Sequence, residues 1–268
     1  MTTYFDRAIT LEPGLPGSFV GGIDRDWWGH RAPWGGAVVA MMLQAMTGVV
    51  DDADRAVRSL TTYFLDPPAD EPMHVSVTVE RRGGAMTAVT ARMTQSDRTP
   101  VVSIATFSRG RDSFEFDDAR MPDVPSPDAS LRVPQAEGFP RFLQHFDMRA
   151  AFGALPYAGV ERAEGGGWIR LEEGRVLDAP LAAAFTDVWI PSVLPRATFP
   201  VVAPTIDLTI HFRHALPLDG ARPDDFAFVR FSSTDARDGI WVEDGEVWSA
   251  DGRLVARSRQ QALVLPLR

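Results

Sequence analysis

The chain has 268 residues, of which 45% are apolar and 24% charged, and its formal net charge is −9. This length can bury a large core, and a charged fraction near the globular average excludes a disordered chain. The acidic balance, with no basic run, excludes nucleic acid and anionic membrane surfaces as expected partners, and the lack of cysteine excludes disulfides, thiolate metal sites and a cysteine nucleophile.

Nothing in the chain predicts export or membrane insertion. The first residues, MTTYFDRAITLEPG, contain acids and lack the apolar centre of a signal peptide. No stretch approaches the ~18 apolar residues that a membrane-spanning helix needs. We therefore expect a cytoplasmic protein.

The first half of the chain alternates short apolar segments with turns. Residues 4–28 read as two strands joined by a turn, and residues 37–50 predict a helix that is buried nearly all round, because this stretch has no charged residue. The two glycines before this helix, Gly35 and Gly36, leave backbone N–H groups free at its positive end. They either bind an anion or a carbonyl oxygen or let the helix pack closely. Four strands are predicted next, at 58–66, 73–82, 86–95 and 101–109.

The second half repeats this order after a segment rich in Asp, Pro and Ser. We expect a first domain at 1–110, a linker at 111–140 and a second domain at 141–268. Strands are predicted at 144–153 and 167–174, a buried helix at 181–194, and further strands at 205–214, 226–235, 241–252 and 253–265.

Three local echoes in the same order support a duplication. The clearest one matches residues 60–64, LTTYF, with residues 208–212, LTIHF, and two shorter echoes flank it. Each unit then consists of strands, one buried helix and four more strands. This pattern predicts an α+β fold in which an antiparallel sheet curls around a central helix in each half.

One acid, Asp187, lies within the second predicted helix. Asp178 and Pro180 suit its start, and Pro191 is expected to end or kink it near Ile190. Burial, together with a position near the helix C-terminus, raises the pKa of a carboxyl group, as a general base requires. The alternative is a structural acid that is paired with an arginine or turned to solvent.

Two polar residues on later strands are further candidates. Alternation in the last strand places Gln260 on its buried face, where a side-chain amide needs partners. Strict alternation from 205 to 212 places Thr205 opposite the apolar face, and so away from Asp187, unless Thr205 precedes the regular strand. The five histidines show no metal-ligand spacing, and neither G-x-S-x-G nor G-x-G-x-x-G occurs in a suitable context.

The pattern resembles the acyl-CoA thioesterase II family. The resemblance rests on Trp34-Gly35-Gly36 before the first helix, on Tyr63-Phe64-Leu65 and on the closing segment DGRLVARSRQQALV. It implies a double hotdog, two antiparallel sheets each wrapped around a central helix. By motif, the family's catalytic Asp, Thr and Gln correspond to Asp187, Thr205 and Gln260. The chain departs from the family at Gln261, at 213–225 and after the two glycines, where a Gln is usual.

The resemblance implies hydrolysis of an acyl-CoA thioester by water, without metal or organic cofactor, in a homodimer or larger homo-oligomer. Trp34, Gly35 and Gly36 are the expected substrate-binding residues, and one site per chain is expected between the halves. A non-catalytic acyl-thioester-binding protein of the same fold remains an alternative. A hydratase is less favoured, since no histidine lies between His145 and His211 to pair with Asp187.

Overall fold

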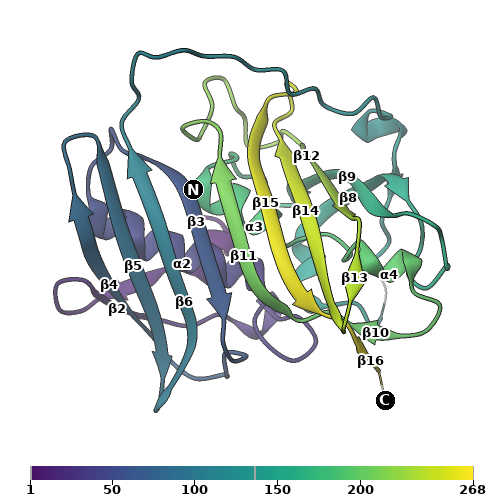
Figure 1. Ribbon diagram of the computed structural model, residues 1–268, viewed down its shortest axis with the longest axis horizontal. Helices are drawn as coiled ribbons and strands as arrows, with labels where there is room; N and C mark the ends of the chain where they lie inside the picture. Colours follow the sequence, from purple (N-terminus) through teal and green to yellow (C-terminus); the bar gives the residue numbers. More distant parts are fainter. Residues whose placement is uncertain (1, 136, 268) are drawn as a thin grey trace.

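A computed structural model describes residues 2–135 and 137–267. Within them, a fourteen-stranded antiparallel sheet runs through both halves of the chain (Figure 1). Its order is β1-β2-β4-β5-β6-β3-β11-β15-β14-β12-β9-β8-β7, with β13 paired to β14. Outward from the junction of β3 and β11, each half adds its strands in an equivalent order. The duplication predicted from the sequence echoes is therefore visible in the sheet.

The strands of the first half are β1 (Leu11–Pro13), β2 (Ser18–Gly21), β3 (Ala56–Phe64), β4 (Met73–Arg82), β5 (Met86–Gln95) and β6 (Arg98–Ser108). Those of the second half are β7 (Leu131–Arg132), β8 (Phe146–Gly153), β9 (Ala163–Leu171), β11 (Thr205–Phe212), β12 (Ala227–Ser233), β13 (Ala236–Arg237), β14 (Ile240–Trp248) and β15 (Leu254–Leu263). A separate pair joins β10 (Val201–Val202) and β16 (Leu265–Pro266).

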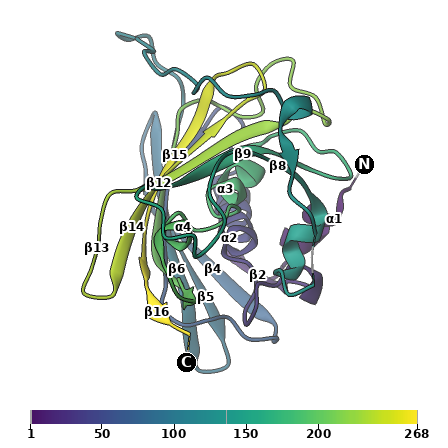
Figure 2. The same ribbon diagram turned by 90° about the vertical axis from the view of Figure 1, so that its right-hand side faces the viewer.

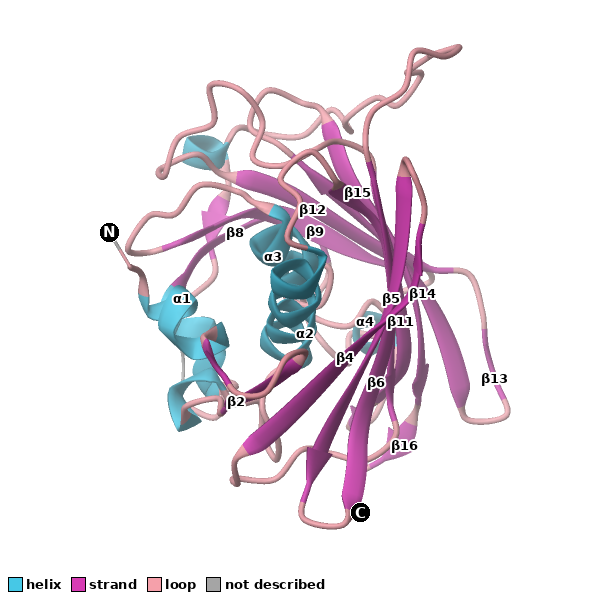
Figure 3. Cartoon of the chain, turned by 90° about the vertical axis from the view of Figure 1, so that its left-hand side faces the viewer, coloured by secondary structure: helices cyan, strands magenta, loops and turns pink. Residues whose placement is uncertain are grey.

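The helices are α1 (Tyr4–Ile9), α2 (Gly35–Val50), α3 (Ala179–Phe185) and α4 (Val193–Arg196), with short 3-10 turns η1 (Arg25–Trp27), η2 (Pro127–Ala129) and η3 (Arg141–His145). The sheet curves around α2 and α3, and α1 lies on the side of these helices away from the sheet (Figures 2 and 3). No helix in the described ranges is long and apolar enough to cross a bilayer.

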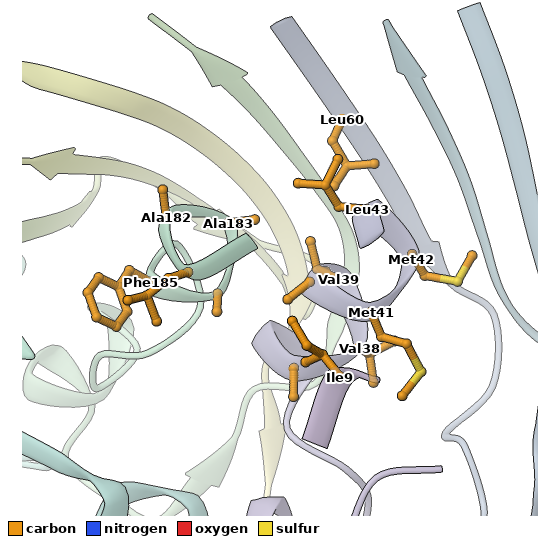
Figure 4. Close-up of a cluster of buried hydrophobic side chains, with 14 of the residues drawn as sticks. Ile9, Val38, Val39, Met41, Met42, Leu43, Leu60, Ala182, Ala183 and Phe185 are labelled. Atoms are coloured by element: carbon orange, nitrogen blue, oxygen red, sulfur yellow. The ribbon is translucent and has the colours of Figure 1, made fainter. Parts of the chain in front are cut away.

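The core lies between the two central helices and the inner face of the sheet. Residues 37–43 of α2 have no exposed surface, so these two turns of helix are buried on all sides, as the uncharged sequence predicts. Side chains of α2 fill the space between α3 and Leu60 of β3 (Figure 4). Burial of this apolar surface is the main force that holds the helices inside the sheet.

Residues 4–9 form a helix where the first of two strands was predicted. Thr3 caps α1: its Oγ1 accepts the N–H of Asp6 at 3.1 Å, and the Asp6 carboxylate accepts the N–H of Thr3 at 2.8 Å. This reciprocal capping box satisfies donors that a helix otherwise leaves free. Phe5 and Ile9 then bury the inner face of the helix. The prediction of a strand at 4–9 was therefore wrong, whereas β2 follows within the predicted range.

The second central helix ends earlier than predicted. α3 stops at Phe185, and the backbone N–H groups of Thr186 and Asp187 bond back to carbonyls of its last turn. The chain then leaves the helix so that Trp189 lies over β9, where a Cβ on Gly167 would come within 2.8 Å of the indole. Glycine at that strand position makes room for the ring. Asp187 therefore lies beyond the helix end, not inside the helix.

Candidate functional site

Asp187 lies where the end of α3 meets the start of α2. A Cβ on Gly35, the first residue of α2, would lie 2.6 Å from Asp187 Oδ2, so only glycine allows this approach. The indole Nε1 of Trp34 donates to the backbone carbonyl of Asp187 at 2.6 Å. Residues from the first half of the chain thus hold the acid supplied by the second half. The start of a sixteen-residue helix is also a favourable position for negative charge.

The pKa of the Asp187 carboxyl is raised toward neutral pH. Burial is the main cause, the nearby Glu243 adds charge repulsion, and together they raise its pKa from 3.8 to about 7. The backbone N–H of Gly36 opposes this shift in part. Asp187 retains some exposed surface. A carboxyl group with a pKa near neutral pH has the protonation behaviour that a general base requires.

Thr205 faces the interior because the strand that carries it is irregular. Thr205 pairs with Ala262 and Asp207 with Gln261, so β11 has one more residue than β15 between these pairs. Such a β-bulge reverses the alternation of side chains at that point. The prediction from strict alternation, that Thr205 points away from the site, was therefore wrong. Its Oγ1 donates to Gln260 Oε1 at 3.0 Å.

Gln260 occupies the face of β15 that alternation predicts. It is buried, as are Ser258 and Ala262 on the same face, whereas Arg257 and Arg259 point outward. Its amide is bonded at both ends, since Oε1 accepts from Thr205 and Nε2 donates to Glu243 Oε1 at 2.6 Å. The buried amide thus has the partners that its position demands.

Glu243 is the residue that the sequence analysis missed. It lies on β14 opposite Gln260 and is 3% exposed. The signal was present, because alternation in the segment Trp241-Val242-Glu243 puts the acid on the face of a buried tryptophan. Glu243 links Gln260 to Asp187. It accepts a hydrogen bond from the Gln260 amide, and its charge raises the pKa of Asp187.

Trp34 is buried rather than open to a ligand. Its indole is 4% exposed and stacks on Phe142 at 4.6 Å between ring centroids. A Cβ on Gly36 would lie 2.3 Å from this indole and 2.7 Å from the Ala184 carbonyl oxygen, so close packing needs glycine there. The structure thus gives Trp34 and both glycines a role in holding Asp187. That they bind substrate remains a prediction.

Among the residues that the structure describes, no three histidine or acidic side chains gather where they could hold a metal ion. The assembled groups are a carboxyl with a raised pKa, a hydroxyl, an amide and a second buried carboxyl. Such a set can orient a water molecule and take its proton.

Two family models cover most of the chain. Residues 24–110 match the N-terminal domain of acyl-CoA thioesterase, and residues 119–264 match its C-terminal domain. The chain belongs to the acyl-CoA thioesterase II family. These matches confirm the resemblance inferred from the sequence. They also confirm that the chain belongs to a family of thioester hydrolases.

Individual relatives agree with this family. Acyl-CoA thioesterase 2 of Haemophilus influenzae is 26% identical over 263 residues, which cover 88% of each chain. A hot dog-fold protein of unknown function from Alicyclobacillus acidocaldarius aligns over all of both chains with a TM-score of 0.90 and 25% identity. An acyl-CoA thioesterase II from Mycobacterium marinum aligns over 98% of both chains with a TM-score of 0.77 and 21% identity. The predicted double hotdog is therefore the observed fold of this thioesterase-family chain.

Proposed function

We propose that this chain hydrolyses acyl-CoA thioesters by direct attack of water, with Asp187 as the general base and Thr205 and Gln260 as the groups that orient the water. The observation that carries the proposal is the bulge in β11. It brings Thr205 onto the buried face beside Gln260, in a site that also holds an acid with a pKa raised to about 7.

The proposed reaction starts from ionised Asp187. The carboxylate accepts a proton from water while the water oxygen attacks the thioester carbonyl carbon, which gives a tetrahedral intermediate. A base with a pKa near the working pH is ionised often enough to act and still basic enough to take the proton. No covalent enzyme intermediate is needed.

The negative charge that develops on the carbonyl oxygen needs donors. The backbone N–H of Gly35, the first residue of α2, supplies a donor in this proposal, since the N–H groups of Ala37 and Val38 already donate to the Trp34 carbonyl and that of Gly36 donates to Asp187. Collapse of the intermediate breaks the carbon–sulfur bond and releases CoA thiolate and the carboxylic acid. The proton held by Asp187 then returns to the thiolate or to solvent.

The test is release of free CoA thiol from a panel of short, medium, long and branched acyl-CoAs. The protein adds no background to a thiol-reactive dye, because it contains no cysteine. We expect turnover by the wild type and a loss of about 10²- to 10⁴-fold in Asp187→Asn, the usual contribution of a positioned base. Circular dichroism and melting curves establish that the variant is folded.

Asp207→Asn is the matched control. Asp207 is also an aspartate whose pKa burial raises, and it lies on the same strand as Thr205 but next to the outward-facing Thr209. We expect it to keep wild-type turnover. Absence of turnover with every acyl-CoA, with binding of these thioesters retained, would instead favour a non-catalytic acyl-thioester-binding protein.

A further inference from the structure

Glu243 is a buried acid that the proposed hydrolysis does not use. Its carboxylate accepts the Ser192 backbone N–H at Oε2 and the Gln260 side-chain N–H at Oε1, each at 2.6 Å. A carboxylate that loses water must be hydrogen-bonded, and these two donors fulfil that need. One of them belongs to a proposed catalytic residue. The acid is therefore tied directly to the site.

The hydrogen bonds that link Glu243, Gln260 and Thr205 have a defined order of donors and acceptors. An ionised carboxylate only accepts, so the Gln260 amide must turn its NH₂ group to Glu243 and its oxygen to Thr205. The Thr205 hydroxyl must then donate its single proton to Gln260 Oε1. Only the lone pairs of Thr205 Oγ1 are left for a third partner.

We propose that Glu243 is a positioning residue that sets this direction and thereby keeps Thr205 a hydrogen-bond acceptor toward the attacking water. This inference rests on the proposed function. A water that donates one proton to Asp187 and the other to Thr205 keeps a lone pair free for the carbonyl carbon. In the reverse direction, Thr205 donates to the water oxygen, which engages one of its two lone pairs, lowers its nucleophilicity and removes the acceptor that orients the second water proton.

Protonation of Glu243 offers the route to the reverse direction. A protonated Glu243 can donate to Gln260, whose amide then turns its NH₂ group toward Thr205. Two other titratable groups act on this acid: Asp187 on the loop after α3, and Asp244 on its own strand, which points outward and pairs with Arg259 at 2.7 Å. Burial raises the pKa of Glu243 from 4.5 to about 7, so this change falls within the working pH range.

Glu243→Gln tests the proposal. A glutamine keeps the size of the side chain, but it has one acceptor oxygen for two facing donors. The hydrogen bonds from position 243 to Thr205 therefore lose their fixed direction. We expect kcat to fall about 10- to 100-fold with little change in KM, the loss seen when a carboxylate that orients a reactive group is removed. We also expect the acid limb of the kcat profile against pH to show one ionisation, that of Asp187, where the wild type shows those of Asp187 and Glu243. Asp244→Asn is the control on the same strand: it should keep the wild-type kcat and both ionisations, and it should only lower the pKa of Glu243 slightly, because the charge of Asp244 contributes to raising that pKa.

A swap variant, Glu243→Gln with Gln260→Glu, restores the direction of the hydrogen bonds that lead to Thr205. The carboxylate now at position 260 accepts from Thr205 and from the amide now at position 243, and the oxygen of that amide accepts from Ser192. We expect the swap variant to exceed the single variant in kcat. It retains the net charge and the number of hydrogen bonds but replaces the water-orienting Gln260, so it is compared with both single variants. If Glu243→Gln does not fold, we expect the swap variant to exceed Gln260→Glu in kcat.

The outcomes separate this inference from the proposed function. A folded Glu243→Gln with the kcat and pH profile of the wild type overturns the role of Glu243 and leaves the hydrolase intact. A folded swap variant whose kcat exceeds that of neither single variant also overturns it. A wild type without turnover on any acyl-CoA overturns the proposed function itself.

Discussion

Asp187→Asn should stabilise the protein, and by an amount that depends on pH. A pKa raised from 3.8 in the unfolded chain to about 7 in the fold means that folding takes up a proton between these values. Wild-type stability therefore falls as pH rises through this window. Each pKa unit corresponds to about 1.4 kcal/mol, so ionised Asp187 destabilises the fold by about 4 kcal/mol above pH ~7.

Asparagine keeps the shape of the side chain and does not titrate in this range. We therefore expect the variant and the wild type to be equally stable near pH ~4 and the variant to gain up to about 4 kcal/mol by pH ~8. Urea unfolding at intervals of half a pH unit measures the difference. Asp244→Asn, an exposed acid nearby, should show no such trend.

A constant difference between variant and wild type across this pH range would refute the reasoning, because it would mean that Asp187 titrates normally. A wild type that is the more stable protein at high pH would refute it as well. In that case a favourable partner, and not burial, would dominate the carboxylate.

Three further changes test how the site is held. Trp34→Phe removes the donor to the Asp187 carbonyl, so we expect a loss of about 1–3 kcal/mol in urea unfolding and lower turnover in the thiol assay. Gly35→Ala places a methyl group 2.6 Å from Asp187 Oδ2, so kcat should fall while far-UV circular dichroism stays unchanged; a wild-type kcat would contradict this approach of α2 to the acid. Arg175→Met removes two ion pairs of 2.8 and 2.6 Å that join α1 to the start of α3, and we expect about 2 kcal/mol of destabilisation in urea unfolding. The effect should be weaker at acid pH where Asp6 is protonated, and the protein that remains folded should keep its activity.

Features that depend on neighbours in the chain could be predicted from the sequence. The uncharged stretch 37–50 forms α2 within two residues of the prediction, and the alternating segments form the central strands. Gln260 faces inward because β15 is regular from Arg257 to Leu263. The duplication was also readable, since two halves that form the same elements keep apolar residues at equivalent places.

One of the errors had a local cause, and the other did not. The apolar residues of 4–9 fit either a helix or a strand over so short a length, and the capping box of Thr3 with Asp6 decides for the helix. α3 ends after Phe185 although apolar residues continue, because Trp189 packs against the glycine run of β9. That partner lies about twenty residues earlier and on another element, so no local pattern indicates it.

The sequence by itself determined the buried central helix, the order of the central strands and the inward face of β15, because periodicity reflects the contact of one segment with a core. Only the tertiary structure decided how the site is assembled. The bulge that turns Thr205 inward depends on pairing with β15, Asp187 meets Gly35 because α3 ends at the start of α2, and Glu243 reaches Gln260 across two strands. Each of these contacts joins residues on different elements, and the contact of Asp187 with Gly35 exists only once both halves have folded against each other.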